Sequence, residues 1–182
     1  MSRDVVLVNR APVLTLWAAV VAERLGYDRD EALSLGKALA GLNAQTKGRS
    51  LGIFKPAEKP EAARKAQPGA ELRVMLLGRP VPAKNTEAGI RALDGDRIVD
   101  PDGVRRYLDG KYGEKLAAVE KAMTALARAV GRNALAAGAF ALYERFRPLV
   151  PEGVQGWGAK GKLDLALIRS LASQGRGRRP TS

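Results

Sequence analysis

Residues 12–26, which read PVLTLWAAVVAERLG, decide the fold of this chain. Pro12 suits the first position of an α-helix and Gly26 suits its end, so the stretch predicts a helix from Pro12 to Gly26. Its apolar residues cover most of the helix circumference instead of keeping to one stripe. We therefore expect this helix at the centre of the molecule, with the other elements packed around it.

The next residues predict a second helix packed against the first. Asp28 and Glu31 have the spacing of an N-cap residue and its acidic partner, and apolar residues then recur at helical spacing as far as Leu42. We expect this helix to fray near Asn43. The pair also has the outline of a helix-turn-helix, but the acidic residues that open its second helix would repel DNA phosphates. We interpret the pair as a helical hairpin of the core.

Further helices and a small β element are predicted downstream. Between Tyr112 and Val130, apolar residues step by three and four, which predicts one buried helical stripe. The other predicted helices cover 104–108, 133–147 and 163–172. The predicted strands cover 72–77, 90–93 and 97–99, the last two forming a hairpin around Asp94 and Gly95. The predicted fold class is therefore mainly α, a single-domain helical bundle with a small β-hairpin or three-strand element in the middle.

One domain is expected over residues 1–173, because 182 residues suit a single core and 46% of them are hydrophobic. Within that domain, residues 47–69 are rich in Gly and Pro and predict a loose basic segment. Residues 174–182 are polar and basic, which predicts a disordered tail.

The composition excludes several chemistries. The chain has no Cys and no His, so disulfides, thiolate nucleophiles and the commonest transition-metal ligands are absent. Four aspartates between residues 94 and 102 lack the spacing of an EF-hand, and Asp94 and Asp100 have turn and cap roles. We expect no metal and no cofactor. No nucleophile–base pair is visible, which favours a protein that is not an enzyme.

No membrane segment is expected. The longest apolar run, residues 13–22, is too short to cross a bilayer, and the first residues lack the pattern of a signal peptide. These observations favour a cytoplasmic protein. The sequence does not indicate an oligomeric state.

The charge of the chain indicates a partner. Lys and Arg number 31 against 19 Asp and Glu, and the net charge is +12. Nine basic and three acidic residues fall between positions 47 and 84. Such an excess suits a polyanion, most simply a nucleic acid, although a solvated loop accounts for it equally well. The candidate nucleic-acid-binding residues here are Lys47, Arg49, Lys55, Lys59, Arg64 and Lys65.

Residues 156–163, which read GWGAKGKL, match two phosphate-loop patterns, G-x-G-x-x-G and G-x-x-x-x-G-K. Leu163 stands where the second pattern needs Ser or Thr, and prolines at 148 and 151 argue against a preceding strand. We expect either a structural turn with Trp157 in the core or a loop that opens a helix and holds phosphate there. The second interpretation makes Lys160 and Lys162 candidate binding residues. In the tail, Arg176, Arg178 and Arg179 are candidates for non-specific phosphate contacts.

The function predicted from these features is non-enzymatic binding of nucleic acid, DNA or RNA, through mostly sequence-independent phosphate contacts. One alternative is a small-molecule or phosphate-ligand binding protein, or an enzyme, that uses the glycine-rich loop 156–162. Another is a protein-interaction module that docks an acidic protein partner through its basic segment.

Two stretches carry a resemblance to known proteins. Residues 9–26, from Asn9 to Gly26, and the motif Tyr143-Glu144-Arg145-Phe146-Arg147-Pro148 with the later Gly156-Trp157-Gly158 are similar to a group of uncharacterised bacterial proteins of similar length. The likeness covers most of the chain and implies no assigned activity.

Overall fold

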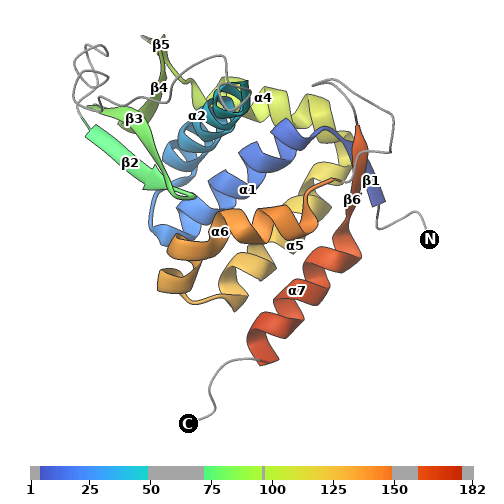
Figure 1. Ribbon diagram of the computed structural model, residues 1–182. Helices are drawn as coiled ribbons and strands as arrows, with labels where there is room; N and C mark the ends of the chain where they lie inside the picture. Colours follow the sequence, from blue (N-terminus) through green and yellow to red (C-terminus); the bar gives the residue numbers. More distant parts are fainter. Residues whose placement is uncertain (1–4, 49–71, 96, 149–159, 178–182) are drawn as a thin grey trace.

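The structure, a computed structural model, describes residues 5–48, 72–95, 97–148 and 160–177 (Figure 1). These residues are mainly α-helical and also form two small antiparallel sheets. One sheet has four strands in the order β2-β3-β4-β5, and the other pairs β1 with β6. Among these residues, no helix is both long enough and apolar enough to cross a membrane.

Helix α1 (Arg10–Leu25) lies at the centre of the molecule, as its sequence predicts (Figure 1). Every residue from Pro12 to Ala22 is buried, and α1 contacts the helices on each of its sides. Trp17 is 0% exposed. Its indole N–H donates to the carbonyl of Ala139 at 2.9 Å, which fixes α1 against helix α6 (Arg132–Phe146). The chain leaves α1 at Gly26, whose φ of 120° suits glycine.

Helix α2 (Arg29–Gly48) begins with the predicted capping box. The N–H of Asp28 donates to Glu31 Oε1 at 3.0 Å, and the N–H of Glu31 donates to Asp28 Oδ1 at 2.8 Å. The expected fraying near Asn43 is wrong, because the helix continues to Gly48. The residues after Asn43 include Ala, Gln and Lys, which are good helix formers, and contain no proline.

The start of α2 contacts helix α4 and strand β4, which agrees with a helical hairpin of the core. Asp30 pairs with Arg105 of helix α4 (Pro101–Tyr112), and Glu31 Oε2 accepts the N–H of Ile90 at 2.9 Å. This end of α2 is therefore occupied by contacts within the fold. Gly36 further along α2 lies against α1, where an added Cβ would meet the carbonyl oxygen of Thr15 at 2.6 Å.

The four-stranded sheet contains β2 (Leu72–Leu76), β3 (Arg79–Thr86), β4 (Gly89–Asp94) and β5 (Arg97–Ile98), and α2 packs against β3 and β4. Strand β2 and the β4–β5 hairpin are as predicted, except that Asp94 pairs with Arg97, so the turn lies one residue later than expected. Strand β3 is not predicted by its sequence, which contains Pro80 and Pro82. Both prolines lie where β3 pairs with β2 alone, so no N–H is needed on the other side.

The two-stranded sheet joins distant parts of the chain. Strand β1 (Val5–Val8) pairs antiparallel with β6 (Gly161–Asp164), with Val5 opposite Asp164 (Figure 1). The expected start of the last helix at Leu163 is wrong, because Leu163 is a buried residue of β6. Helix α7 instead runs from Leu165 to Gly177, so residues 174–177 are helical and not part of a disordered tail.

The predicted helix at 112–130 is divided. Helix α4 ends at Tyr112, Gly113 takes a φ of 58°, a 3-10 turn covers Gly113–Lys115, and helix α5 runs from Leu116 to Ala129. The predicted apolar stripe is confirmed, since its central residues are fully buried. These are Val119, Met123 and Leu126. They join the side chains of α1 and α7 in one connected apolar core.

Candidate anion-binding site

Most of the basic residues predicted from the sequence lie outside the described residues. Lys47 lies in the last turn of α2 and Arg176 in the last turn of α7. The structure describes the backbone of these two residues but not their side chains. The residues outside are Arg49, Lys55, Lys59, Arg64, Lys65, Arg178 and Arg179. Their role in binding stays a prediction.

Lys160 and Lys162 are exposed, but the local structure differs from the predicted one. Lys162 belongs to strand β6, where it pairs with Leu7 of β1, and the helix that follows begins three residues later. Asp164 caps that helix by accepting the N–H of Ala166 at 2.9 Å. A carboxylate thus stands where a phosphate was expected, so a helix N-terminus does not join the two lysines in binding an anion.

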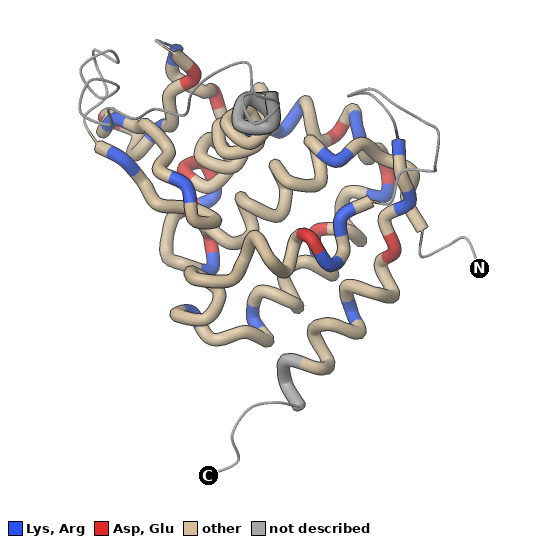
Figure 2. Tube along the Cα trace, viewed as in Figure 1, with Lys and Arg blue, Asp and Glu red and all other residues tan. Residues whose placement is uncertain are grey.

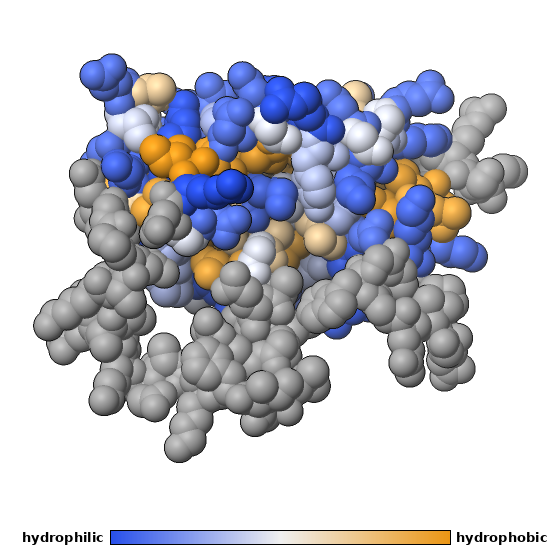
Figure 3. Space-filling model, turned by 90° about the horizontal axis from the view of Figure 1, so that it is seen from above, coloured by the Kyte–Doolittle hydropathy of each residue, from blue (hydrophilic) through white to orange (hydrophobic). Residues whose placement is uncertain are grey.

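The charges of the described chain are spread over its surface. Figure 2 shows Lys and Arg positions on all sides of the trace, with Asp and Glu among them. The face drawn in Figure 3 is mostly hydrophilic where it is described, with hydrophobic surface in separate patches. A binding site therefore has to be sought in a local cluster and not in one broad basic face.

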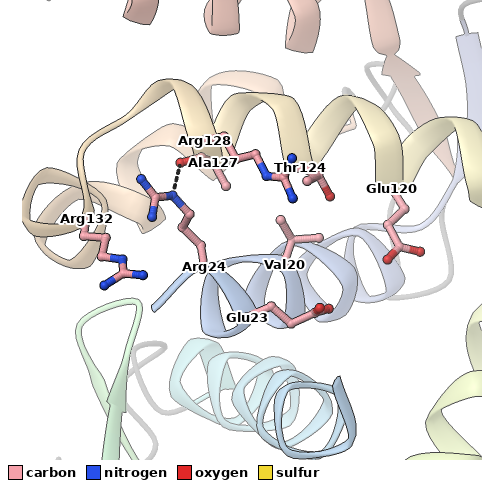
Figure 4. A pocket seen from close by; sticks show the side chains of 8 residues that line it. All are labelled: Val20, Glu23, Arg24, Glu120, Thr124, Ala127, Arg128 and Arg132. Carbon is pink, nitrogen blue, oxygen red and sulfur yellow. Dashed lines mark hydrogen bonds between the residues drawn. The ribbon is translucent and has the colours of Figure 1, made fainter. Parts of the chain in front are cut away.

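Such a cluster lines a pocket of about 490 Å³ between α1, α5 and the first turn of α6 (Figure 4). The lining residues are Val20, Glu23, Arg24, Glu120, Thr124, Ala127, Arg128 and Arg132. In Figure 4, Arg24 and Arg132 lie toward one end and the carboxylates of Glu23 and Glu120 toward the other, with the Arg128 guanidinium between them. The pocket is therefore polar along its length and has a basic part and an acidic part.

Three helix ends supply the basic part. Arg24 lies in the last turn of α1, Arg128 in the last turn of α5, and Arg132 is the first residue of α6. The Nε–H of Arg24 donates to the carbonyl of Ala127 at 3.2 Å, which holds this side chain in place. Arg128 and Arg132 are exposed. Within the described ranges, none of the three forms an ion pair with a carboxylate.

The acidic part is already occupied by a cation of the protein. Arg29, at the start of α2, pairs with Glu23 at 2.7 Å and with both carboxylate oxygens of Glu120, the longer contact being 3.1 Å. Partial burial lowers the pKa of Arg29, but hydrogen bonds and attraction from Glu120 and Glu23 outweigh it and hold the pKa above its ordinary value. Glu23 and Glu120 are thus engaged by Arg29 and leave the three arginines unpaired.

The charge of the site follows from these pairs. Together with Arg29, the side chains of the pocket carry four positive and two negative charges, a net of two positive. Helix α6 begins beside Arg132 with no acidic residue in its first turn and no side-chain cap on its N-terminus. Guanidinium groups and an uncapped helix start both favour an anion, and the guanidinium fork suits phosphate or carboxylate oxygens.

The structure offers no comparable arrangement for a metal ion in the part of the chain that it describes. No group of three or more acidic side chains lies together there. Asp100 caps α4 by accepting the N–H of Asp102 at 3.2 Å, and Asp102 pairs with Arg105 at 2.6 Å. Asp100 and Asp102 therefore have structural partners.

Comparison with known proteins found no match among family models, curated proteins or solved structures. The pocket is therefore interpreted from its own geometry. Sequence reasoning did not find it, because Arg24 lies more than 100 residues before Arg128 and Arg132. The available signal was that Arg24, Arg128 and Arg132 lie at the ends of three predicted helices.

Proposed function

We propose that this protein binds nucleic acid without catalysis, mainly through contacts to phosphate. The observation that carries the proposal is the state of the pocket: Arg24, Arg128 and Arg132 face it without carboxylate partners, while Arg29 engages Glu23 and Glu120. Guanidinium groups bind phosphate oxygens through paired, charge-assisted hydrogen bonds. These contacts do not read bases, so little sequence preference is expected.

The overall charge supports a polyanionic partner. A net charge of +12 attracts a nucleic acid from a distance and speeds its encounter with the protein. The nine basic residues between positions 47 and 84 would extend the contact beyond the pocket. Lys47, Arg49, Lys55 and Lys59 stay the first candidates for that extension, followed by Lys160 and Lys162.

The available side chains support binding in preference to catalysis. Cys and His are absent from the chain, and Glu23 and Glu120 in the pocket are paired with Arg29. A carboxylate that is paired with a guanidinium is a weak general base, because the pair stabilises its charged form. Thr124 is the hydroxyl residue in the lining.

The concave shape of the site favours one alternative, a small phosphorylated ligand. A volume of about 490 Å³ falls within the range of small-molecule sites. In this alternative the ligand binds in the arginine pocket and not in the glycine-rich loop 156–162. The remaining alternative is an acidic protein partner. A competition experiment distinguishes it from the other two, because an acidic polypeptide would displace such a partner and a nucleic acid would not.

A binding titration tests the proposal. Fluorescence anisotropy with labelled DNA and RNA of about 20 nucleotides should give micromolar binding at 50 mM salt. In duplex DNA, each phosphate contact should add about −0.9 to the slope of log K against the logarithm of the salt concentration. The variant Arg128→Ala/Arg132→Ala should bind more weakly. The matched control is Arg106→Ala/Arg145→Ala, which removes the same charge from exposed positions outside the pocket lining.

Two results would contradict the proposal. One is the absence of any complex with DNA or RNA at tens of micromolar protein in low salt. The other is a competition in which polyglutamate displaces the labelled nucleic acid and unlabelled nucleic acid does not. That result would instead support an acidic protein partner. An equal loss of affinity in both double variants would place the contact outside the pocket.

The proposal includes a single domain over residues 1–173, built as a helical bundle, and a cytoplasmic location. The connected apolar core supports one domain. Limited proteolysis that released two separately folded fragments would contradict this part, and cell fractionation tests the location.

A further inference from the structure

We propose that the arginine pocket is a site for a phosphomonoester, a phosphate group with a single ester bond, and that in the bound nucleic acid this group is the terminal phosphate of a strand. This inference rests on the proposed function and specifies which phosphate the pocket takes. The same chemistry is found in a small sugar phosphate, so the test below separates the two sources.

The charge of the pocket matches a phosphomonoester better than an internal phosphate. With Arg29 included, the pocket carries a net of two positive charges. A phosphomonoester carries about −1.5 to −2 at neutral pH and offers three acceptor oxygens. An internal phosphodiester carries a single negative charge and has one fewer free oxygen. The terminal group therefore balances the site, whereas an internal group leaves part of its positive charge uncompensated.

The order of charges along the pocket also favours a strand end. Arg24 and Arg132 lie toward one end, and Glu23 and Glu120 lie toward the other (Figure 4). A strand that continued through the pocket would carry its next phosphate past those two carboxylates. Arg29 neutralises only one of their two charges. Repulsion at that end thus opposes a continuing strand and leaves a terminal phosphate unaffected.

One held and two exposed arginines suit the capture of such a group. Arg24 is held by its hydrogen bond to Ala127, while Arg128 and Arg132 are exposed and can change rotamer to close on an oxygen. Arg132 also begins α6, where no side chain caps the first N–H groups and no acid lies in the first turn.

The experiment compares strands that differ only at their ends. Labelled single strands of one sequence carry a 5′-phosphate, a 3′-phosphate or hydroxyl groups at both ends, and their affinity is measured by anisotropy. Because a terminal phosphate forms charge-assisted hydrogen bonds that a hydroxyl end lacks, we expect at least one phosphorylated strand to bind about tenfold or more tightly than the hydroxyl strand.

Three variants connect that preference to the pocket. Arg132→Lys keeps the charge but removes the fork, and should reduce the preference while affinity for the hydroxyl strand stays. Glu120→Gln removes a charge from the acidic part and should raise affinity for the hydroxyl strand, which also reduces the preference. The control Arg145→Lys, on an exposed residue outside the pocket lining, should leave the preference unchanged.

Ribose 5-phosphate is titrated separately as a small phosphomonoester, with dimethyl phosphate as the diester control. If ribose 5-phosphate competes only at millimolar concentration while end preference persists, a strand end is the ligand. If it binds at micromolar concentration and Arg132→Lys weakens it, the pocket still takes a phosphomonoester but from a small molecule.

Different results would overturn the phosphomonoester site and the binding of nucleic acid. Equal affinity for phosphorylated and hydroxyl strands, with no binding of ribose 5-phosphate, overturns the phosphomonoester site and leaves nucleic-acid binding intact. Absence of binding to every strand overturns the proposed function, and the ribose 5-phosphate titration then decides the pocket on its own.

Discussion

Replacing Gly36 by Ala should separate the two helices that build the centre of the molecule. A Cβ at this position would lie 2.6 Å from the carbonyl oxygen of Thr15 and 2.9 Å from the backbone nitrogen of Ala19. Both atoms belong to the backbone of α1, so no side chain can turn aside to make room. Helix α2 would have to move away from α1, and the contact between these helices would loosen along its length.

The size of the effect follows from two opposing terms. Overpacking in a core costs about 1–3 kcal/mol, and contact with backbone favours the upper part of that range. Alanine also improves helix propensity over glycine by about 1 kcal/mol. The net loss of unfolding free energy should therefore be about 2 kcal/mol, which corresponds to a melting temperature lower by roughly 4–8 °C in a chain of this length.

The same helix provides a matched control. Gly41 lies on α2, and an added Cβ there would meet nothing within 4 Å. Gly41→Ala should therefore raise stability by about 0.5–1 kcal/mol through helix propensity alone. Urea unfolding followed by circular dichroism measures both variants. If Gly36→Ala were as stable as Gly41→Ala, the close approach of α1 and α2 at Gly36 would be wrong.

Three further perturbations test the core, the buried Tyr143 and the basic segment. Leu126→Ala, in the buried stripe of α5, should cost about 2–5 kcal/mol, and a melting temperature within a degree of wild type would contradict it. Burial raises the pKa of Tyr143 from 10.0 to about 12, so the stability this neutral side chain contributes is complete below pH 10 and is lost as pH rises toward 12. Alkaline unfolding should show that loss, and Tyr143→Phe should reduce it. A fourfold alanine variant should weaken nucleic-acid binding and leave the melting temperature nearly unchanged, whereas equal affinity would move the contact elsewhere. It replaces Lys47, Arg49, Lys55 and Lys59.

Features that depend on neighbouring residues were predictable from the sequence. The central position of α1 follows from apolar residues on all its sides, and the start of α2 follows from the spacing of Asp28 and Glu31. The buried stripe of α5 follows from steps of three and four residues. In each case, the residues that form the sequence pattern are the same residues that are buried or that cap the helix.

Features that depend on pairing between distant residues were not predictable. Strand β3 contains prolines that argue against a strand, and only the one-sided pairing at Pro80 and Pro82 makes them acceptable. The sequence alone favours a helix at Leu163, because its strand partner Val6 lies more than 150 residues earlier. The pocket likewise needs the ends of α1, α5 and α6 at one place, and no local pattern in any one of these helices indicates the other two.

The pairing of β1 with β6 also constrains the order in which the protein can fold during its synthesis. Val5 leaves the ribosome long before Asp164, the residue that it pairs with. Until β6 emerges, β1 has no strand partner, while α1, α2 and the four-stranded sheet can already make their contacts with one another, which lie within residues 10–98. Closure of this long loop is costly in chain entropy and is therefore slow. Strand β1, which is made before the other strands of the described residues, should thus be among the last to find its place, and a chain released before residue 164 would leave it open to pairing with another molecule.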